Sequence, residues 1–201
     1  MTENNKNERL KILVVGVGGQ GVLTVARIIG EAALLSGMNV TVGQLHGMSQ
    51  RGGAVSSTVV IGPGRTAMIN AGQADVVLGF EPLEVMRAIP LMSKKTTVII
   101  SKSRVVPFNL AIQGKPYPDF EKIIAEIGAI SSRIYPVDVV EMISKVGSSR
   151  SINFLMLGAL AGLLLLPFDQ NILWQAVEKR IDPRLLEINQ NAFNLAIESM
   201  N

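Results

Sequence analysis

Short apolar runs alternate with helical stretches over the first three quarters of the chain. Runs rich in β-branched residues predict strands, and apolar positions that recur every three or four residues predict helices. The predicted strands are residues 11–15, 39–42, 54–61, 66–69, 74–79, 96–100 and 134–137. The predicted helices among them are residues 22–35, 82–92, 119–129 and 139–145. This alternation is typical of an α/β protein.

Glycines and prolines mark the turns between these elements. Ser36-Gly37 ends the first helix, so the first 42 residues predict a strand–helix–strand unit with a right-handed crossover. The Gly-Pro-Gly turn at 62–64 predicts that the runs on either side of it form a β-hairpin. From Ser151 the pattern is entirely helical, with helices over 151–166, 169–179 and 184–200. We therefore expect a Rossmann-like, mostly parallel sheet with flanking helices, a hairpin insertion and a helical C-terminal part.

The N-terminal segment and the most apolar run of the chain indicate how many domains it has and in which compartment the protein is expected. Residues 1–10 are mostly polar and predict a flexible tail, and residues 11–201 show no repeat or shift in composition and predict one domain. The tail lacks the apolar core of a signal peptide, which predicts a cytoplasmic protein. The longest apolar run, 154–166, has thirteen residues. A bilayer span needs roughly 18–20, so we interpret this run as a buried helix without contact to a membrane.

The composition narrows the chemistry. The 201 residues include 19 Lys and Arg against 16 Asp and Glu, a net charge of +3 without a basic run, so no nucleic-acid partner is expected. Cysteine is absent, which excludes disulfides and any thiolate-bound zinc or iron–sulfur cluster on this chain alone. With His46 as the only histidine, no metal site is expected, and no nucleophile with a placed base is apparent.

A glycine-rich turn joins the first predicted strand to the first predicted helix. It matches G-x-G-x-x-G, and its candidate binding residues are Gly16, Gly18, Gly19, Gln20 and Gly21. Three interpretations stay open: close packing of the helix on its strand, a phosphate or other anion at the helix N-terminus, and a complete NAD or FAD site. The third needs an acidic residue near the end of the second strand, where residues 41–45 have none.

A second glycine-rich segment, LHGMSQRGG, follows the second predicted strand. Its candidate binding residues are His46, Gln50, Arg51, Gly52 and Gly53. His46 suits a proton relay near neutral pH, and Arg51 can hold a carboxylate or phosphate. Hydrogen bonds from His46 to nearby carbonyls and a solvated Arg51 are the alternatives. Because α/β sheets place their binding crevices at this edge, we expect this segment to contact a ligand or another subunit without acting in catalysis.

Three segments together resemble the gamma component of 2-oxoacid:ferredoxin oxidoreductases, and especially the indolepyruvate oxidoreductase beta-subunit type. They are GVGGQGVLT at 16–24, LHGMSQRGGAVSS at 45–57 and INFLMLGAL at 152–160. The resemblance extends over about residues 11–194. Asn153, in the third segment, matches an asparagine typical of the family. Its position at the start of a helix is compatible with capping of backbone donors, which we favour, or with contact to a ligand.

The resemblance implies one subunit of a larger enzyme that decarboxylates a 2-oxoacid, forms an acyl-coenzyme A and passes electrons to ferredoxin. It implies that thiamine diphosphate, magnesium, iron–sulfur clusters and coenzyme A are held by partner subunits. This chain is then expected to be non-catalytic and to pack on the thiamine-binding subunit near the thiamine and coenzyme A pocket. Isolated, it is expected to be inactive, and its high apolar content would allow a homodimer when the partner is absent. The alternative is a self-sufficient NAD- or FAD-binding protein.

Overall fold

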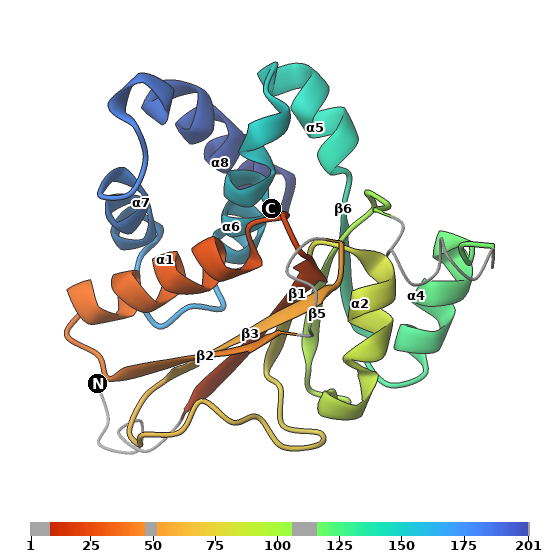
Figure 1. Ribbon diagram of the computed structural model, residues 1–201. Helices are drawn as coiled ribbons and strands as arrows, with labels where there is room; N and C mark the ends of the chain where they lie inside the picture. Colours follow the sequence, from red (N-terminus) through yellow and green to blue (C-terminus); the bar gives the residue numbers. More distant parts are fainter. Residues whose placement is uncertain (1–8, 47–51, 106–115, 201) are drawn as a thin grey trace.

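A mixed six-stranded sheet forms the centre of the computed structural model, which describes residues 9–46, 52–105 and 116–200 (Figure 1). The strand order is β2-β3-β1-β4-β5-β6. β1, β4, β5 and β6 pair in parallel, whereas β3 is antiparallel to both β1 and β2. The sheet is therefore mostly parallel with one reversed strand. The strands are β1 (Leu10–Val17), β2 (Val40–His46), β3 (Ala54–Ile61), β4 (Val76–Gly79), β5 (Thr97–Ser101) and β6 (Arg133–Val137).

Helices cover both faces of this sheet (Figure 1). One face carries α1 (Val22–Leu35), α5 (Val139–Val146), α6 (Ile152–Gly162), α7 (Gln170–Glu178) and α8 (Leu186–Met200). The other face carries α2 (Pro82–Arg87), the 3₁₀ turn η2 (Ile89–Leu91) and α4 (Phe120–Gly128). The remaining 3₁₀ turns are η3 (Ser149–Ser151) and η4 (Pro183–Leu185). The predicted Rossmann-like, mostly parallel sheet with flanking helices and a helical C-terminal part is confirmed.

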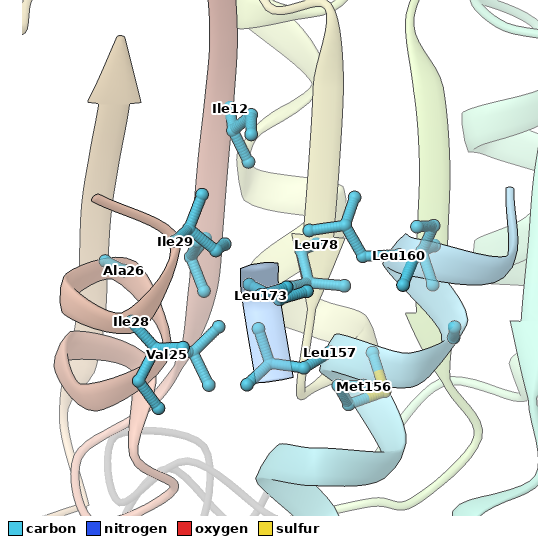
Figure 2. Packing of buried hydrophobic residues seen from close by; sticks show 14 of the residues in the cluster. Ile12, Val25, Ala26, Ile28, Ile29, Leu78, Met156, Leu157, Leu160 and Leu173 are labelled. Carbon is cyan, nitrogen blue, oxygen red and sulfur yellow. The ribbon is translucent and has the colours of Figure 1, made fainter. Parts of the chain in front are cut away.

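The two faces have separate hydrophobic clusters because side chains alternate along each strand. On β1, Ile12 belongs to the cluster under α1 and α6, whereas Leu13 belongs to the cluster under α2 and α4. Figure 2 shows the first cluster, in which Ile29 of α1 and Leu157 of α6 lie beside strand residues such as Leu78. Each of these side chains is at most 2% exposed. Burial on this scale is the main force that holds the helices to the sheet.

Capping residues begin the helices close to the predicted positions. Glu81 precedes Pro82, and its Oε2 accepts a hydrogen bond of 3.1 Å from the Glu84 N–H. The Asp138 carboxylate accepts one of 3.1 Å from Glu141 at the start of α5, which also lowers the pKa of Asp138. Both side chains satisfy backbone donors that have no partner inside the helix.

The predicted β-hairpin across residues 62–64 is wrong. Residues 66–69 form no strand, and β3 instead pairs with β1 on one side and β2 on the other. The segment crosses the face of the sheet: a Cβ at Gly43 would lie 2.7 Å from the Ala67 Cβ, and Ile69 is 7% exposed. Met68, by contrast, is 70% exposed, so this run contacts the sheet at only some of its positions. Its composition is nevertheless that of a short strand, which is why the apolar pattern predicted one.

Two predicted helices end earlier than expected. Of the predicted tail, residues 1–10, the structure describes only the last two residues. α2 stops at Arg87 and continues as η2, where Pro90 has no N–H to donate. The apolar helix predicted over 151–166 ends at Gly162, just before Leu164 with its positive φ of 52°. None of the helices within residues 9–46, 52–105 and 116–200 is both long and apolar enough to cross a membrane. Residues 1–8 of the tail lie outside the described residues, and Leu10 already belongs to β1.

Candidate functional site

The β1–β3 pairing brings the two predicted glycine-rich segments together. Gly16 lies opposite Val55, and beyond the strands the Gly18 N–H donates to the Gly53 carbonyl over 2.8 Å. The Gly52 N–H donates back to the Gly18 carbonyl over 3.4 Å. Both segments therefore meet at the carboxyl end of β1, as expected for a site on an α/β sheet. Gln50, Arg51 and the side chain of His46 lie outside the described residues.

Gln20 closes the glycine-rich turn with its side chain. Its Oε1 accepts from the Val17 N–H over 2.7 Å, and its Nε2 donates to the Phe80 carbonyl over 3.2 Å. A Cβ at Gly16 would lie 2.8 Å from this Oε1 and 3.0 Å from the Phe80 Cβ. The amide thus ties the turn to the end of β4, and Gly16 leaves the space that the amide occupies. Contact between Gln20 and a ligand stays a prediction.

The N-terminus of α1 begins at Gly21 without a side-chain cap. Gly21 has a φ of +82°, no side chain of the described residues caps the first-turn N–H groups, and the first turn has no acidic residue. The first backbone bond of the helix runs from the Val25 N–H to the Gly21 carbonyl, over 3.0 Å. The N–H groups before Val25 have no partner inside the helix. Such free N–H groups, together with the positive end of the helix dipole, favour a bound anion.

Asn153 lies against this uncapped helix start. A Cβ at Gly21 would be 2.7 Å from Asn153 Oδ1, although the two residues belong to different helices. Oδ1 is buried and has no hydrogen-bond partner among the described residues. The favoured capping interpretation is wrong, because Ser151 occupies the N-cap of α6 and neither Asn153 nor another described side chain caps that helix. Asn153 thus brings a buried, unused polar atom to the glycine-rich turn, and a ligand contact stays a prediction.

A cavity of about 510 Å³ opens beside the turn. It is lined by Val17, Gly18, Gly19, Gly21, Val22, Leu23, Gln44 and Val55. None of these side chains is charged, so the cavity offers backbone donors and apolar surface without the acid that a dinucleotide ribose needs. Within the described ranges, no group of three or more His, Cys, Asp or Glu residues could hold a metal ion.

Two buried carboxyl groups lie beyond the end of β4, and the sequence patterns did not single them out. Glu81 is 0% exposed and accepts a hydrogen bond from the Tyr117 hydroxyl, 36 residues away. Glu84 is 5% exposed, and its Oε1 accepts from Arg87 Nη1 over 3.0 Å. The Arg104 guanidinium lies 5.5 Å from the centre of the Tyr117 ring. The helix periodicity could locate Glu84 and Arg87 on one turn, but no local pattern links Glu81 to Tyr117.

Burial is the largest cause of the pKa shifts of Glu81, Glu84 and Tyr117. It raises the pKa of Glu81, against the hydrogen bonds from Tyr117 and from backbone N–H groups. It also raises the pKa of Glu84, with Arg87 opposing the shift and the neighbouring Glu81 charge adding to it. Burial and the bond to Glu81 raise the pKa of Tyr117, so the tyrosine stays a donor at neutral pH. The pair Glu81–Tyr117 is fully hydrogen-bonded and therefore fixes α2 to the residues before α4.

Comparison with known proteins now identifies the class. The chain matches the model of the pyruvate ferredoxin/flavodoxin oxidoreductase family over residues 11–199, and it belongs to this family. It is 39% identical over 182 residues to the indolepyruvate oxidoreductase subunit IorB of Methanothermobacter thermautotrophicus, covering 90% of this chain and 93% of the relative. It is 36% identical over 187 residues to the IorB subunit of Archaeoglobus fulgidus, covering 93% of each chain.

A solved structure agrees at the level of the fold. The chain is similar to the gamma subunit of a keto/oxoacid ferredoxin oxidoreductase from Geobacter sulfurreducens, with a TM-score of 0.68 and 21% sequence identity. The similarity covers 95% of this chain and 98% of that one. The resemblance inferred from the three sequence segments is thereby confirmed. The comparisons do not assign roles to individual residues, so the candidate binding residues remain predictions.

Proposed function

We propose that this chain is the small, non-catalytic subunit of a thiamine diphosphate-dependent 2-oxoacid:ferredoxin oxidoreductase. The complex would decarboxylate an aryl 2-oxoacid such as indolepyruvate, form the acyl-coenzyme A and reduce ferredoxin. The observation that carries this proposal is the match, along nearly the full length of both chains, to subunits named for indolepyruvate oxidation. The chain has no cysteine, so iron–sulfur clusters bound through thiolates would belong to partner chains.

The surface at the glycine-rich turn would face the catalytic, thiamine-binding subunit. Gly18, Gly19 and Gly53 present backbone without side chains, so another chain or a cofactor bound to it can approach closely. The uncapped start of α1 would supply N–H donors to a phosphate oxygen or a carboxylate. Asn153 would add an amide whose buried oxygen has no partner in the described chain. These contacts would complete a pocket that is mainly built by the partner.

The cofactors of such complexes fit this chain to different degrees. A phosphate of coenzyme A would accept hydrogen bonds from the backbone N–H groups of Gly21 and of the first turn of α1, and this chain would thereby position it. Coenzyme A, when bound, supplies the thiol that takes up the acyl group. The described residues include no cluster of His, Asp or Glu that could bind magnesium, and the chain has no cysteine to bind an iron–sulfur cluster. We therefore expect other chains of the complex to hold both.

A charge placed at Gly19 tests the proposed face. Gly19 is exposed, has a φ of +105° and would have no atom within 4 Å of an added Cβ. We expect Gly19→Asp to repel an anion and to weaken assembly with the catalytic subunit, or ferredoxin reduction by the complex, at least tenfold. Gly19→Asn has nearly the same shape and is strained to the same extent by this φ, so it should retain more assembly and more ferredoxin reduction than Gly19→Asp.

The experiment starts from the tagged chain purified from its source cells without oxygen. Partner masses, visible absorption and reduction of ferredoxin with a panel of 2-oxoacids would establish the complex and its substrate. Equal assembly and turnover for the two Gly19 variants would show that this face lies away from the partner and its anionic cofactors. A colourless preparation without partners that releases heat on titration with NAD(H) or FAD would favour the self-sufficient dinucleotide-binding alternative.

A further inference from the structure

A second and larger cavity lies on the face of the sheet opposite α1. Its volume is about 670 Å³, within the range typical of small-molecule sites. Leu13 and Val15 of β1 form part of its floor, residues 66–69 form one wall, and α2 with η2 forms the other. It shares only Gln44 and Val55 with the cavity at the glycine-rich turn. The proposed subunit contact does not account for it.

The cavity exists because small residues line it where no helix covers the sheet. α2 and α4 pack over β1, β4, β5 and β6, whereas β2 and β3 are crossed on this face by residues 66–69 (Figure 1). Small side chains or none at all face the space at several positions. These positions are Gly43, Ala54, Ser56, Ala67 and Ala88. Larger side chains at these positions would fill the cavity, as large apolar side chains fill the space between sheet and helices on the opposite face.

One ion pair stands in this otherwise mostly apolar lining. Glu84 and Arg87 both line the cavity and bond to each other through Oε1 and Nη1. Glu84 is nearly buried, at 5% exposure, whereas the Arg87 side chain is 49% exposed and therefore lies nearer the opening. Among the described residues, the bond between Arg87 Nη1 and Glu84 Oε1 is the one side-chain hydrogen bond of this pair, so Glu84 Oε2 and Arg87 Nη2 remain without a partner there. The pair thus offers an acceptor and a donor, with no net charge.

We propose that this cavity binds a zwitterionic α-amino acid with a bulky apolar side chain. The ammonium group would donate to Glu84, the carboxylate would accept from Arg87, and the side chain would lie between Leu13, Val15 and Ile69. A neutral pair of opposite charges is complementary to a neutral zwitterion. A ligand with only a carboxylate would meet Glu84 repulsion, and one with only an ammonium group would meet Arg87 repulsion.

The environment of Glu84 supports this assignment. Burial raises the pKa of Glu84 despite the neighbouring Arg87, so the guanidinium compensates only part of the lost hydration. A ligand ammonium group would supply the missing partner. Of the nearby charged groups, Glu81 adds repulsion, and its own hydrogen bonds to Tyr117 and the Glu84 N–H are already formed. Glu84 is therefore the carboxyl group left available to a ligand.

Three matched probes test the proposal by calorimetric titration of the full chain. L-Phenylalanine has both charged groups, 3-phenylpropionate lacks the ammonium group, and phenethylamine lacks the carboxylate. We expect L-phenylalanine to bind at least about tenfold more tightly than either, since each of the other probes leaves one charged hydrogen bond unformed. Glu84→Gln should abolish the preference over 3-phenylpropionate, and Arg87→Met should abolish the preference over phenethylamine. Arg180→Met is the matched control, because Arg180 is also ion-paired and half-exposed but lies away from this cavity.

A labelling experiment tests the same site without altering the ion pair. Met68 lines the cavity and is 70% exposed, and the chain has no cysteine, so Met68→Cys introduces a unique thiol. L-Phenylalanine should slow its alkylation, and L-alanine should not. Equal binding of the three probes, unchanged preferences in the two variants, or no binding at millimolar concentration would overturn the proposal. Protection by the partner subunit alone, without an effect of L-phenylalanine, would overturn it in favour of a protein contact. Loss of assembly in the Gly19 test would leave these readouts unaffected.

Discussion

Replacing Gly21 with alanine isolates the contact between the glycine-rich turn and Asn153. An alanine at φ +82° is strained by about 1–2 kcal/mol, as expected for a left-handed residue with a Cβ. The new methyl group would also lie 2.7 Å from Asn153 Oδ1, and overpacking of this kind costs about 1–3 kcal/mol. We therefore expect Gly21→Ala to lower the free energy of unfolding by about 2–5 kcal/mol.

The matched control separates strain from packing. Gly37, at the other end of α1, has a φ of +72°, and an added Cβ there would meet no atom within 4 Å. Gly37→Ala should therefore cost only the conformational part, about 1–2 kcal/mol. Urea denaturation followed by circular dichroism at 222 nm measures both differences, provided that the slope of the transition is unchanged.

A double substitution decides whether Asn153 is the cause. Asn153→Ala removes the side chain that the new methyl group meets, so Gly21→Ala should cost about 1–3 kcal/mol less in that background. Equal destabilisation by Gly21→Ala and Gly37→Ala, or the absence of rescue by Asn153→Ala, would refute the reasoning. In that case the close approach of α6 to the turn would have no energetic role.

Two further predictions concern helix packing and pH. Gly158→Ala should destabilise the fold by at least about 1–3 kcal/mol, because its Cβ would overlap the Phe193 carbonyl oxygen of α8 and crowd the Ala196 Cβ. Gly128→Ala, with only one contact at 3.9 Å, should be neutral or stabilising in the same denaturation assay. The raised pKa of Glu84 means that the folded state binds its proton more tightly, so the unfolding free energy should fall as pH rises from about 4.5 through the raised value. Glu84→Gln should make this fall smaller, and an unchanged pH slope would contradict that assignment.

The fold was predictable where the information is local. The period of apolar positions located α1 and α8. The ends of α1 agree closely with the prediction because Gly21 and Gly37, which flank it, act within one turn. The place of β3 was not predictable in the same way. The sequence of β3 is equally compatible with a neighbour on either side. The hairpin is excluded only by the conformation of residues 66–69, which form no strand and contact the sheet through Ile69.

In the candidate site, too, local features could be predicted from the sequence and tertiary contacts could not. The motif at Gly16–Gly21 predicted a turn between strand and helix, and the resemblance related it to the segment with Gly53. The Asn153 contact and the Glu81–Tyr117 bond depend on packing between elements far apart in sequence. No spacing rule predicts such contacts, and the cavity between α2 and residues 66–69 likewise follows from the tertiary arrangement alone.

The reversed strand also has a consequence for the order in which the chain can fold. β2 has a single neighbour in the sheet, β3, so it cannot join β1 when it leaves the ribosome. Once residue 61 has emerged, however, β3 can pair with β1 on one side and β2 on the other, and this three-stranded antiparallel unit needs no later segment. The contacts between β2 and β3 are the more local ones and are expected to form first, whereas the contacts between β1 and β3 bridge α1 and β2. The parallel half of the sheet would then be added to an existing edge at β1, so synthesis from the N-terminus offers a template for the slower pairings.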